Sequence, residues 1–241
     1  MPENAEKSER DHLNETRARL LAAALPHVPF DGWSAATLEA AMADAGLEAG
    51  LARLALPRGV VDLALEHHRQ GDEEMQRRAA ELDLSALRYS ARVAALVRLR
   101  LEVAGGREVV RRGVTFFALP AHAADGAAAI WRTADRIWET LGDSSRDINW
   151  YSKRMILSGV YSSTLLYWLG DDSPGHRATW EFLDRRIEEV MTFERLKGRL
   201  RDSPLCRGLM RGPGRLLERV RAPAGGRHDL PGTLAAGEGR E

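Results

Sequence analysis

The sequence is short of the residues that build β-sheets and disulfides. β-branched residues are sparse, whereas Ala, Leu, Arg and Glu, which favour helices, are abundant. Cys206 is the single cysteine of the 241 residues, so no disulfide can form within the chain and no cysteine-based metal cluster is possible, which fits a reducing compartment. These shortages predict an all-α protein.

Long apolar runs are also missing. No stretch approaches the roughly 18 consecutive apolar residues that a membrane-spanning helix needs, so we expect any membrane contact to be peripheral. The first ten residues, MPENAEKSER, resemble neither a secretory signal nor a transit peptide. We therefore expect a bacterial cytoplasmic protein, peripheral on the inner membrane, rather than a mitochondrial one.

The chain has no excess of charge of either sign. Its 35 basic residues balance its 35 acidic residues. Proteins that hold nucleic acids by neutralising phosphates usually carry a basic excess. The one clear basic excess here lies near the C-terminus, so we expect no nucleic-acid partner.

Glycine, proline and charge divide the chain into regions. Residues 1–10 and 222–241 are predicted to be disordered. Between them we predict about ten helices, with N-terminal helices over 11–80 and a larger helical half over 81–202. The first helix, near 11–25, is stopped by Pro26 and Pro29, and another helix runs over 84–104. A basic amphipathic segment over 203–221 completes the chain.

The order of helical segments and turn residues over 30–67 predicts a helix-turn-helix followed by a longer helix. Ser34 is a plausible N-cap of its first helix and Gly46 a plausible C-cap. This order resembles the DNA-binding end of TetR-type regulators. However, the second helix, EAGLARLAL, offers Arg53 as its single cation and begins with Glu48, whereas a groove-reading helix needs several Arg, Lys, Asn or Gln side chains. We expect the fold without the DNA binding.

Large apolar residues recur at helical spacing after Leu84. Such stripes are most often a filled helical core. Periodicity alone does not decide whether the space between the stripes is filled or hollow.

Two composite motifs carry a family resemblance. They are TADRIWETLGDSSRDINWYSKR over 133–154 and TLLYWLGDDSPGHRATWEFLDRRIEEVM over 164–191. Together with the helix-turn-helix, they resemble the TetR-like lipid-binding accessory protein family of ubiquinone (coenzyme Q) biosynthesis, in a bacterial member. The shared residues include Asp143, Ser145, Arg154, Asp171 and Thr179.

The resemblance implies a TetR-like homodimer with no enzymatic activity and no DNA-binding function. It assigns lipid binding and dimerisation to the helices over 81–202. It implies no cofactor, but a hydrophobic pocket for an isoprenoid, a quinone intermediate or another lipid. It also implies a partner, the di-iron hydroxylase that acts on demethoxyubiquinone. The candidate pocket residues are the large apolar side chains of the stripes: Leu96, Val97, Leu101, Phe117, Trp131, Ile137, Trp138, Tyr151 and Met155.

The resemblance also implies a surface patch that contacts the hydroxylase. Trp180 and Leu183 are three residues apart and share a helix face, as suits an interface anchor. Two alternatives remain open: Trp180 packs inward as core, and Asp171–Pro174 is a helix-capping turn. The candidate patch consists of Tyr167, Trp168, Asp171, Trp180, Leu183 and Arg186.

The segment from Pro204 to Val220 alternates basic and apolar residues, as in a helix that lies in a membrane interface. Gly212-Pro213-Gly214 should break it into two pieces, and a solvated basic tail is the alternative. The candidate membrane residues are Leu205, Arg207, Leu209, Arg211, Arg215, Leu216 and Arg219.

No grouping of catalytic residues is recognisable. Glu66-His67-His68 and Asp72-Glu73-Glu74 lack the Glu-x-x-His spacing of di-iron helices, so we predict a solvated polar helix end and no metal site. Neither a nucleophile triad nor a phosphate loop is present. The alternative to the accessory protein is a ligand-responsive TetR-type transcriptional regulator.

Overall fold

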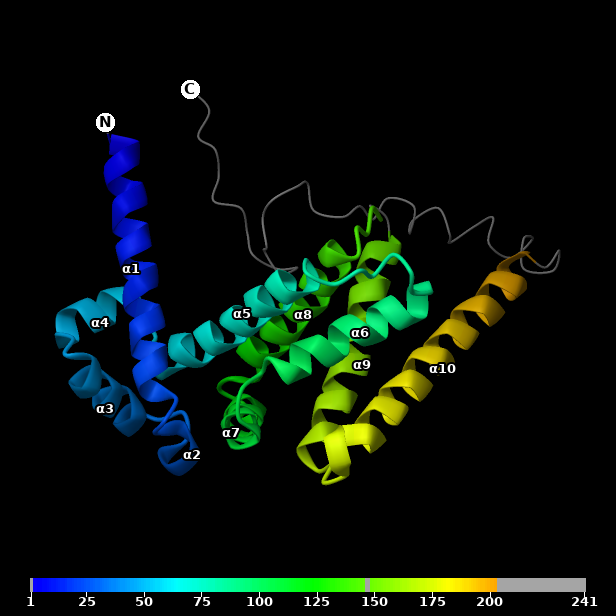
Figure 1. Ribbon diagram of the computed structural model, residues 1–241. Helices are drawn as coiled ribbons and strands as arrows, with labels where there is room; N and C mark the ends of the chain where they lie inside the picture. Colours follow the sequence, from blue (N-terminus) through cyan, green and yellow to red (C-terminus); the bar gives the residue numbers. More distant parts are fainter. Residues whose placement is uncertain (1, 146–147, 203–241) are drawn as a thin grey trace.

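The computed structural model of the chain describes residues 2–145 and 148–202, and every regular element in this part is a helix (Figure 1). The prediction of an all-α fold with about ten helices is confirmed. The first five are α1 (Pro2–Ala24), α2 (Val28–Asp31), α3 (Ala35–Ala45), α4 (Ala49–Ala55) and α5 (Val60–Ala79). They are followed by α6 (Tyr89–Glu102), α7 (Arg107–Ala118), α8 (Ala123–Thr140), α9 (Ile148–Leu169), a short 3₁₀ helix (Pro174–His176) and α10 (Arg177–Asp202).

The helix-turn-helix forms as its local signals predict. Ser34 caps α3, because its Oγ accepts a hydrogen bond from the backbone N–H of Thr37 at 3.2 Å. Gly46 ends the helix with φ of 61°, a left-handed conformation that glycine adopts at little cost. Helix α1 packs across α3 and α4, and apolar side chains of α1 to α5 and of α7 form the first of two cores.

Two N-terminal elements differ from the prediction. Helix α1 already begins at Pro2, within the ten residues predicted to be disordered. Its sequence from Glu3 to Ala24 contains neither proline nor glycine, so nothing local stops the helix there. Helix α1 ends at Ala24, as the stop at Pro26 and Pro29 predicts, but the short helix α2 then forms where no helix was predicted. Pro29 stands in the first turn of α2, where a proline removes no hydrogen bond.

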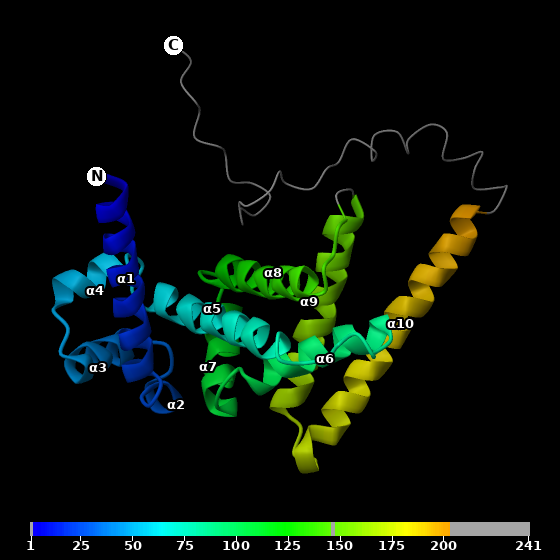
Figure 2. The ribbon, with the colours of Figure 1, turned by 45° about the horizontal axis from the view of Figure 1, so that its top comes forward.

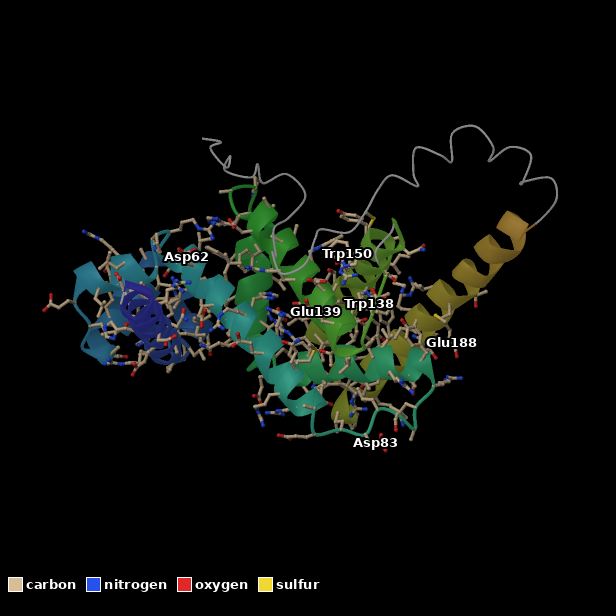
Figure 3. The ribbon with its side chains drawn as sticks, turned by 90° about the horizontal axis from the view of Figure 1, so that it is seen from above. Asp62, Asp83, Trp138, Glu139, Trp150 and Glu188 are labelled. Atoms are coloured by element: carbon tan, nitrogen blue, oxygen red, sulfur yellow. The ribbon has the colours of Figure 1, made fainter. Side chains whose placement is uncertain are left out.

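The larger half of the molecule is built on α5, which runs from the N-terminal helices into a group formed by α6 to α10 (Figure 2). In this group α8 packs on α5 and α9, while α10 packs on α6 and α9. The side chains between these helices form the second core. Figure 3 shows Trp138 in the middle of this group, and Asp62 toward the N-terminal helices.

Helix α6 begins at Tyr89, later than the predicted Leu84. Asp83 accepts hydrogen bonds from the N–H and the hydroxyl of Ser85, which holds the preceding residues in a turn. Across residues 2–145 and 148–202, no helix is both long and apolar enough to cross a membrane.

Candidate functional site

A cavity of about 340 Å³ lies where the two cores meet. Trp33, Ala64 and Val109 reach it from the first core, whereas Ala104, Val110, Tyr161 and Leu165 reach it from the second. Helices α5, α6, α7, α8 and α9 all contribute side chains to its wall. The volume is in the range of small-molecule sites in proteins, about 300–1,000 Å³.

The wall formed by α7 and α8 is apolar. Its small and branched side chains are Val109, Val110, Val114, Phe117, Ala123, Ala127 and Ile130. At Gly126 the two helices approach so closely that a Cβ would lie 2.6 Å from the Cβ of Phe117. Leu166 of α9 also lines the cavity and is 59% exposed, so the cavity reaches the molecular surface beside this residue.

The opposite end of the cavity is polar but internally paired. Arg100 of α6 donates from Nε to Asp72 of α5 at 2.6 Å and from Nη2 to the carbonyl of His68 at 3.1 Å. Asp72 accepts a second hydrogen bond from Thr133 of α8 at 2.7 Å. At Gly71 a Cβ would lie 2.7 Å from Cζ of Arg100, so glycine leaves the space that the guanidinium fills.

Two neutral histidines stand beside this ion pair. Burial, with the charge of Arg100, lowers the pKa of His67 to about 4, even though a hydrogen bond to the backbone of Ala104 opposes the shift. Burial also lowers the pKa of His68 well below its ordinary value, and Arg100 adds to the effect. At neutral pH the end of the cavity therefore carries the charges of one ion pair and no charged imidazole.

The predicted pocket residues divide into three groups. Phe117 lines the cavity, and Trp138 lines a second cavity of about 260 Å³ between α6, α8, α9 and α10. The second group lies away from both cavities. Trp131 and Tyr151 form an aromatic cluster with Trp150, in which the ring centres of Trp150 and Tyr151 are 4.7 Å apart. Met155, also in this group, is 66% exposed. The remaining four are fully buried core side chains that line neither cavity: Leu96, Val97, Leu101 and Ile137.

The first composite motif joins α8 to α9. Arg154 of α9 donates to Asp135 of α8 at 2.5 Å and to Asp143 of the connecting loop at 3.3 Å, and its guanidinium lies 3.9 Å from the ring centre of Trp150. Asp143 also accepts from Lys153 and Ser145. Although burial opposes it, these hydrogen bonds lower the pKa of the Asp143 carboxyl. Figure 3 shows Trp150 near the middle of the helical group, in the same region as Trp138.

The second motif builds the turn before α10. Asp171 accepts hydrogen bonds from the hydroxyl and N–H of Thr179, at 2.6 and 2.9 Å, and from the N–H of Ser173 at 2.8 Å. These bonds hold the pKa of the Asp171 carboxyl far below its ordinary value. The capping turn that the sequence left as an alternative is therefore present, and Asp171 itself is buried within it.

The candidate patch residues do not share one surface. Trp168, Asp171 and Leu183 are buried in the chain. Trp180 lies on the α6 side of α10, where Arg98 stacks 4.7 Å from its ring centre and Nε1 donates to the Gly175 carbonyl. Tyr167 belongs to α9, is 40% exposed and stacks on Phe182 of α10. The guanidinium of Arg186 lies 5.5 Å from the Phe182 ring centre.

The candidate membrane residues, Leu205 to Arg219, lie outside the described residues, as do the two pieces that Gly212-Pro213-Gly214 would separate. In the described part of the chain no group of three or more His, Cys, Asp or Glu side chains is placed to hold a metal ion. The prediction of a solvated polar helix end is wrong for Glu66 and Asp72, which are both buried. Glu66 pairs with Arg69 and Gln70, and Asp72 with Arg100.

The polar end of the cavity was not predicted from the sequence. Arg100 continues the buried face of Val93, Leu96 and Val97 at spacings of seven, four and three residues, so it stands where a helix presents its core side. An arginine in that position needs a buried partner. This pattern could have indicated the ion pair, although not that its partner is Asp72.

The sequence of this chain is similar to ubiquinone biosynthesis proteins. A family model described as COQ9 matches residues 123–194, from the start of α8 into α10. The mitochondrial ubiquinone biosynthesis protein COQ9 of Xenopus tropicalis is 31% identical over 192 residues, which are 74% of this chain and 59% of the frog protein. The corresponding protein of Rattus norvegicus is 28% identical over 217 residues, which are 85% of this chain and 69% of the rat protein. The chain therefore spans only about three fifths of the length of the frog relative.

Among solved structures, a TetR transcriptional regulator from Nitrosomonas europaea superimposes with a TM-score of 0.59 at 20% identity, over 73% of this chain and 97% of that chain. At this identity the similarity concerns the fold alone. The comparisons thus confirm both parts of the expectation: the chain resembles the COQ9 proteins of ubiquinone biosynthesis, and it has a TetR-like fold.

Proposed function

We propose that this chain is a non-enzymatic accessory protein of ubiquinone biosynthesis that holds an isoprenoid quinone intermediate in the cavity between its two cores. Its similarity to COQ9 proteins supports the pathway. The observation that carries the ligand assignment is the apolar cavity that reaches the surface at Leu166.

The physical case rests on the contrast between the two ends of the cavity. The α7–α8 wall gives a prenyl chain apolar contact, which stabilises it by about 25 cal/mol for each Å² removed from water. The other end is lined by Arg100, Tyr161 and His68, which would face the polar ring of the ligand. A molecule with an apolar tail and a polar head fits this contrast better than a wholly polar metabolite.

The proposal includes presentation of the ligand to the di-iron demethoxyubiquinone hydroxylase. Tyr167, stacked on Phe182 beside Arg186, is the part of the predicted patch that combines an exposed aromatic ring with a cation. Aromatic and arginine side chains are the common anchors of protein interfaces. We assign the contact to this edge of α9 and α10, rather than to the buried Trp168, Asp171 and Leu183.

Homodimerisation and membrane attachment complete the proposal. The exposed Met155 and Leu166 of α9 are eleven residues apart and lie on one face of the helix, which suits contact with a second copy. The alternation of basic and apolar residues over 203–221 favours attachment to anionic headgroups.

The test is to fill the cavity. Val114→Trp places an indole in the space lined by Val114, whereas Thr115→Trp places the same indole on the exposed side of α7. After purification from cells and organic extraction, we expect mass spectrometry to find a polyprenyl lipid with the wild type and Thr115→Trp, and little with Val114→Trp. Equal lipid in all three, or none in the wild type, would refute the cavity assignment.

The TetR-like fold favours a second candidate, a ligand-responsive transcriptional regulator. The segment that would enter the major groove is α4, whose exposed side chains include the cation Arg53 and the apolar Leu54. The base-reading side chains that recognition requires are missing from this helix. A gel shift with the promoter neighbouring its gene should show no specific complex at physiological salt, and a specific complex would favour the regulator.

A further inference from the structure

The indole of Trp33 is a buried hydrogen-bond donor without an acceptor. Trp33 lies between α2 and α3, is 5% exposed and packs in the first core. Its Nε1 has no hydrogen-bond partner in the described structure, although the side chain lines the cavity. Buried N–H groups are nearly always paired, so an unpaired one at a cavity wall indicates a partner supplied from inside the cavity.

Nε1 is closed to water in this structure, and the part of the wall that faces it is a glycine. A Cβ at Gly113 of α7 would lie 3.5 Å from Nε1, in van der Waals contact, so α7 places no side chain against the N–H. The ring of His67 lies 5.5 Å away, centre to centre, and is engaged with the backbone of Ala104. Both Gly113 and His67 line the same cavity as Trp33.

Arg100, the strongest donor in the wall, is held by the protein through two of its nitrogens. Its Nε donates to Asp72 and its Nη2 to the His68 carbonyl. Trp33 has no such competing acceptor. An indole N–H can only donate, and a pure hydrocarbon has nothing to receive the bond.

We infer that Trp33 Nε1 donates a hydrogen bond to an oxygen atom of the molecule that occupies the cavity. This specificity contact rests on the proposed function and deepens it. The ligand must be an apolar molecule that carries an acceptor oxygen, such as a carbonyl or an ether, and that oxygen lies beside Gly113. The contact distinguishes a prenylated quinone from a plain isoprenoid hydrocarbon.

The test uses two probes with the same carbon skeleton, prenyl-1,4-benzoquinone and prenylbenzene. Binding of each to the full chain, stripped of lipid, is measured by calorimetry. Trp33→Phe keeps an aromatic ring but removes the N–H. We expect it to weaken quinone binding about fivefold to tenfold, the effect of one net hydrogen bond, and to change prenylbenzene binding less than twofold.

Trp138→Phe is the matched control, because Trp138 Nε1 is also buried and unpaired but lines the second cavity. It should leave the affinity for both probes unchanged. Quinone binding that is weakened by Trp138→Phe and not by Trp33→Phe would overturn the assignment to Trp33.

Gly113→Ala gives an independent measurement should Trp33→Phe fold poorly. Its methyl group lies in van der Waals contact with the indole nitrogen and takes the space assigned to the ligand oxygen, while alanine favours the helix, so quinone binding should weaken and thermal stability should be retained. Unchanged quinone affinity in both Trp33→Phe and Gly113→Ala would refute the hydrogen bond alone. A wild type that binds neither probe would refute the proposed lipid function, and the hydrogen bond with it.

Discussion

Arg100 and Asp72 form a buried ion pair that fixes the polar end of the cavity. Arg100 Nε lies 2.6 Å from Asp72 Oδ1, and the two side chains expose 3% and 8% of their surface. Because Thr133 donates to the same carboxylate oxygen, the pair connects α5, α6 and α8. A buried charge that loses its partner is costly, so this contact dominates the electrostatics of the cavity.

Arg100→Met should therefore destabilise the fold, by about 3 kcal/mol or more, because it leaves Asp72 charged and buried. Adding Asp72→Leu should recover much of the loss, since the buried charge is then removed as well. Urea unfolding measures both variants. The control is Glu102→Ala, which breaks the exposed Arg98–Glu102 pair of the same helix and should cost about 0.5 kcal/mol. A similar small loss in Arg100→Met would show that the pair is solvated.

The turn before α10 depends on Asp171. Asp171→Ala removes the acceptor of three hydrogen bonds and should lower the melting temperature by several degrees. Asp172→Ala is the matched control, because the neighbouring side chain is almost fully exposed and forms a surface ion pair with Arg107. Thermal denaturation followed by circular dichroism compares the two. Equal losses would mean that the cap contributes nothing beyond an exposed carboxylate.

The helices were predictable because their signals are local. Ser34 and Gly46 bound α3 as expected, since capping depends on a few neighbouring residues. The start of α6 was missed, because the turn at Asp83 competes with the helix through its side chain. Helix α2 was missed as well, because Pro29 is compatible with the first turn of a new helix although it cannot continue the preceding one.

The site was less predictable, because burial is a property of the assembled helices. Leu96 and Phe117 both occupy apolar stripes, yet Leu96 fills the core and Phe117 faces the cavity. Periodicity identifies the inward face of a helix but not whether a neighbour fills the space opposite. The pairing of Arg100 with Asp72, and the isolation of the Trp33 indole, likewise depend on contacts between distant segments.

Tyr167 tests the proposed hydroxylase contact. Tyr167→Ala removes an exposed ring that stacks on Phe182, so we expect hydroxylase binding to weaken at least tenfold with little change in melting. Pull-down and calorimetry with the purified hydroxylase measure the effect. Tyr151→Ala, an aromatic truncation in the Trp150 cluster on the same helix, is the control and should leave the affinity unchanged. Loss of binding with Tyr151→Ala but not with Tyr167→Ala would move the interface away from the α9–α10 edge.

The two neutral histidines predict a specific dependence of stability on pH. Both folded-state pKa values lie below the ordinary 6.5, because burial and Arg100 disfavour the charged rings, and Arg132 adds to the effect at His68. Between pH 6.5 and about 4 the unfolded chain therefore binds more protons than the folded chain at His67. Stability should be complete above pH 6.5 and fall as the pH drops through this window. The lowered carboxyl pKa values of Asp143 and Asp171 affect stability only at lower pH.

His67→Phe separates this effect from general acid denaturation. At pH 5 the buried His67 should cost about 2 kcal/mol relative to pH 7.5, because its pKa lies at about 4 in the folded chain and one pKa unit corresponds to about 1.4 kcal/mol. The variant should therefore lose about 2 kcal/mol less than the wild type when urea unfolding at pH 7.5 and pH 5 is compared. His12→Phe, at an exposed position of α1, should keep the wild-type dependence. If His67→Phe and the wild type lose equal stability on acidification, the His67 ring accepts its proton in the folded chain, and the assignment of a neutral imidazole to the polar end of the cavity is wrong.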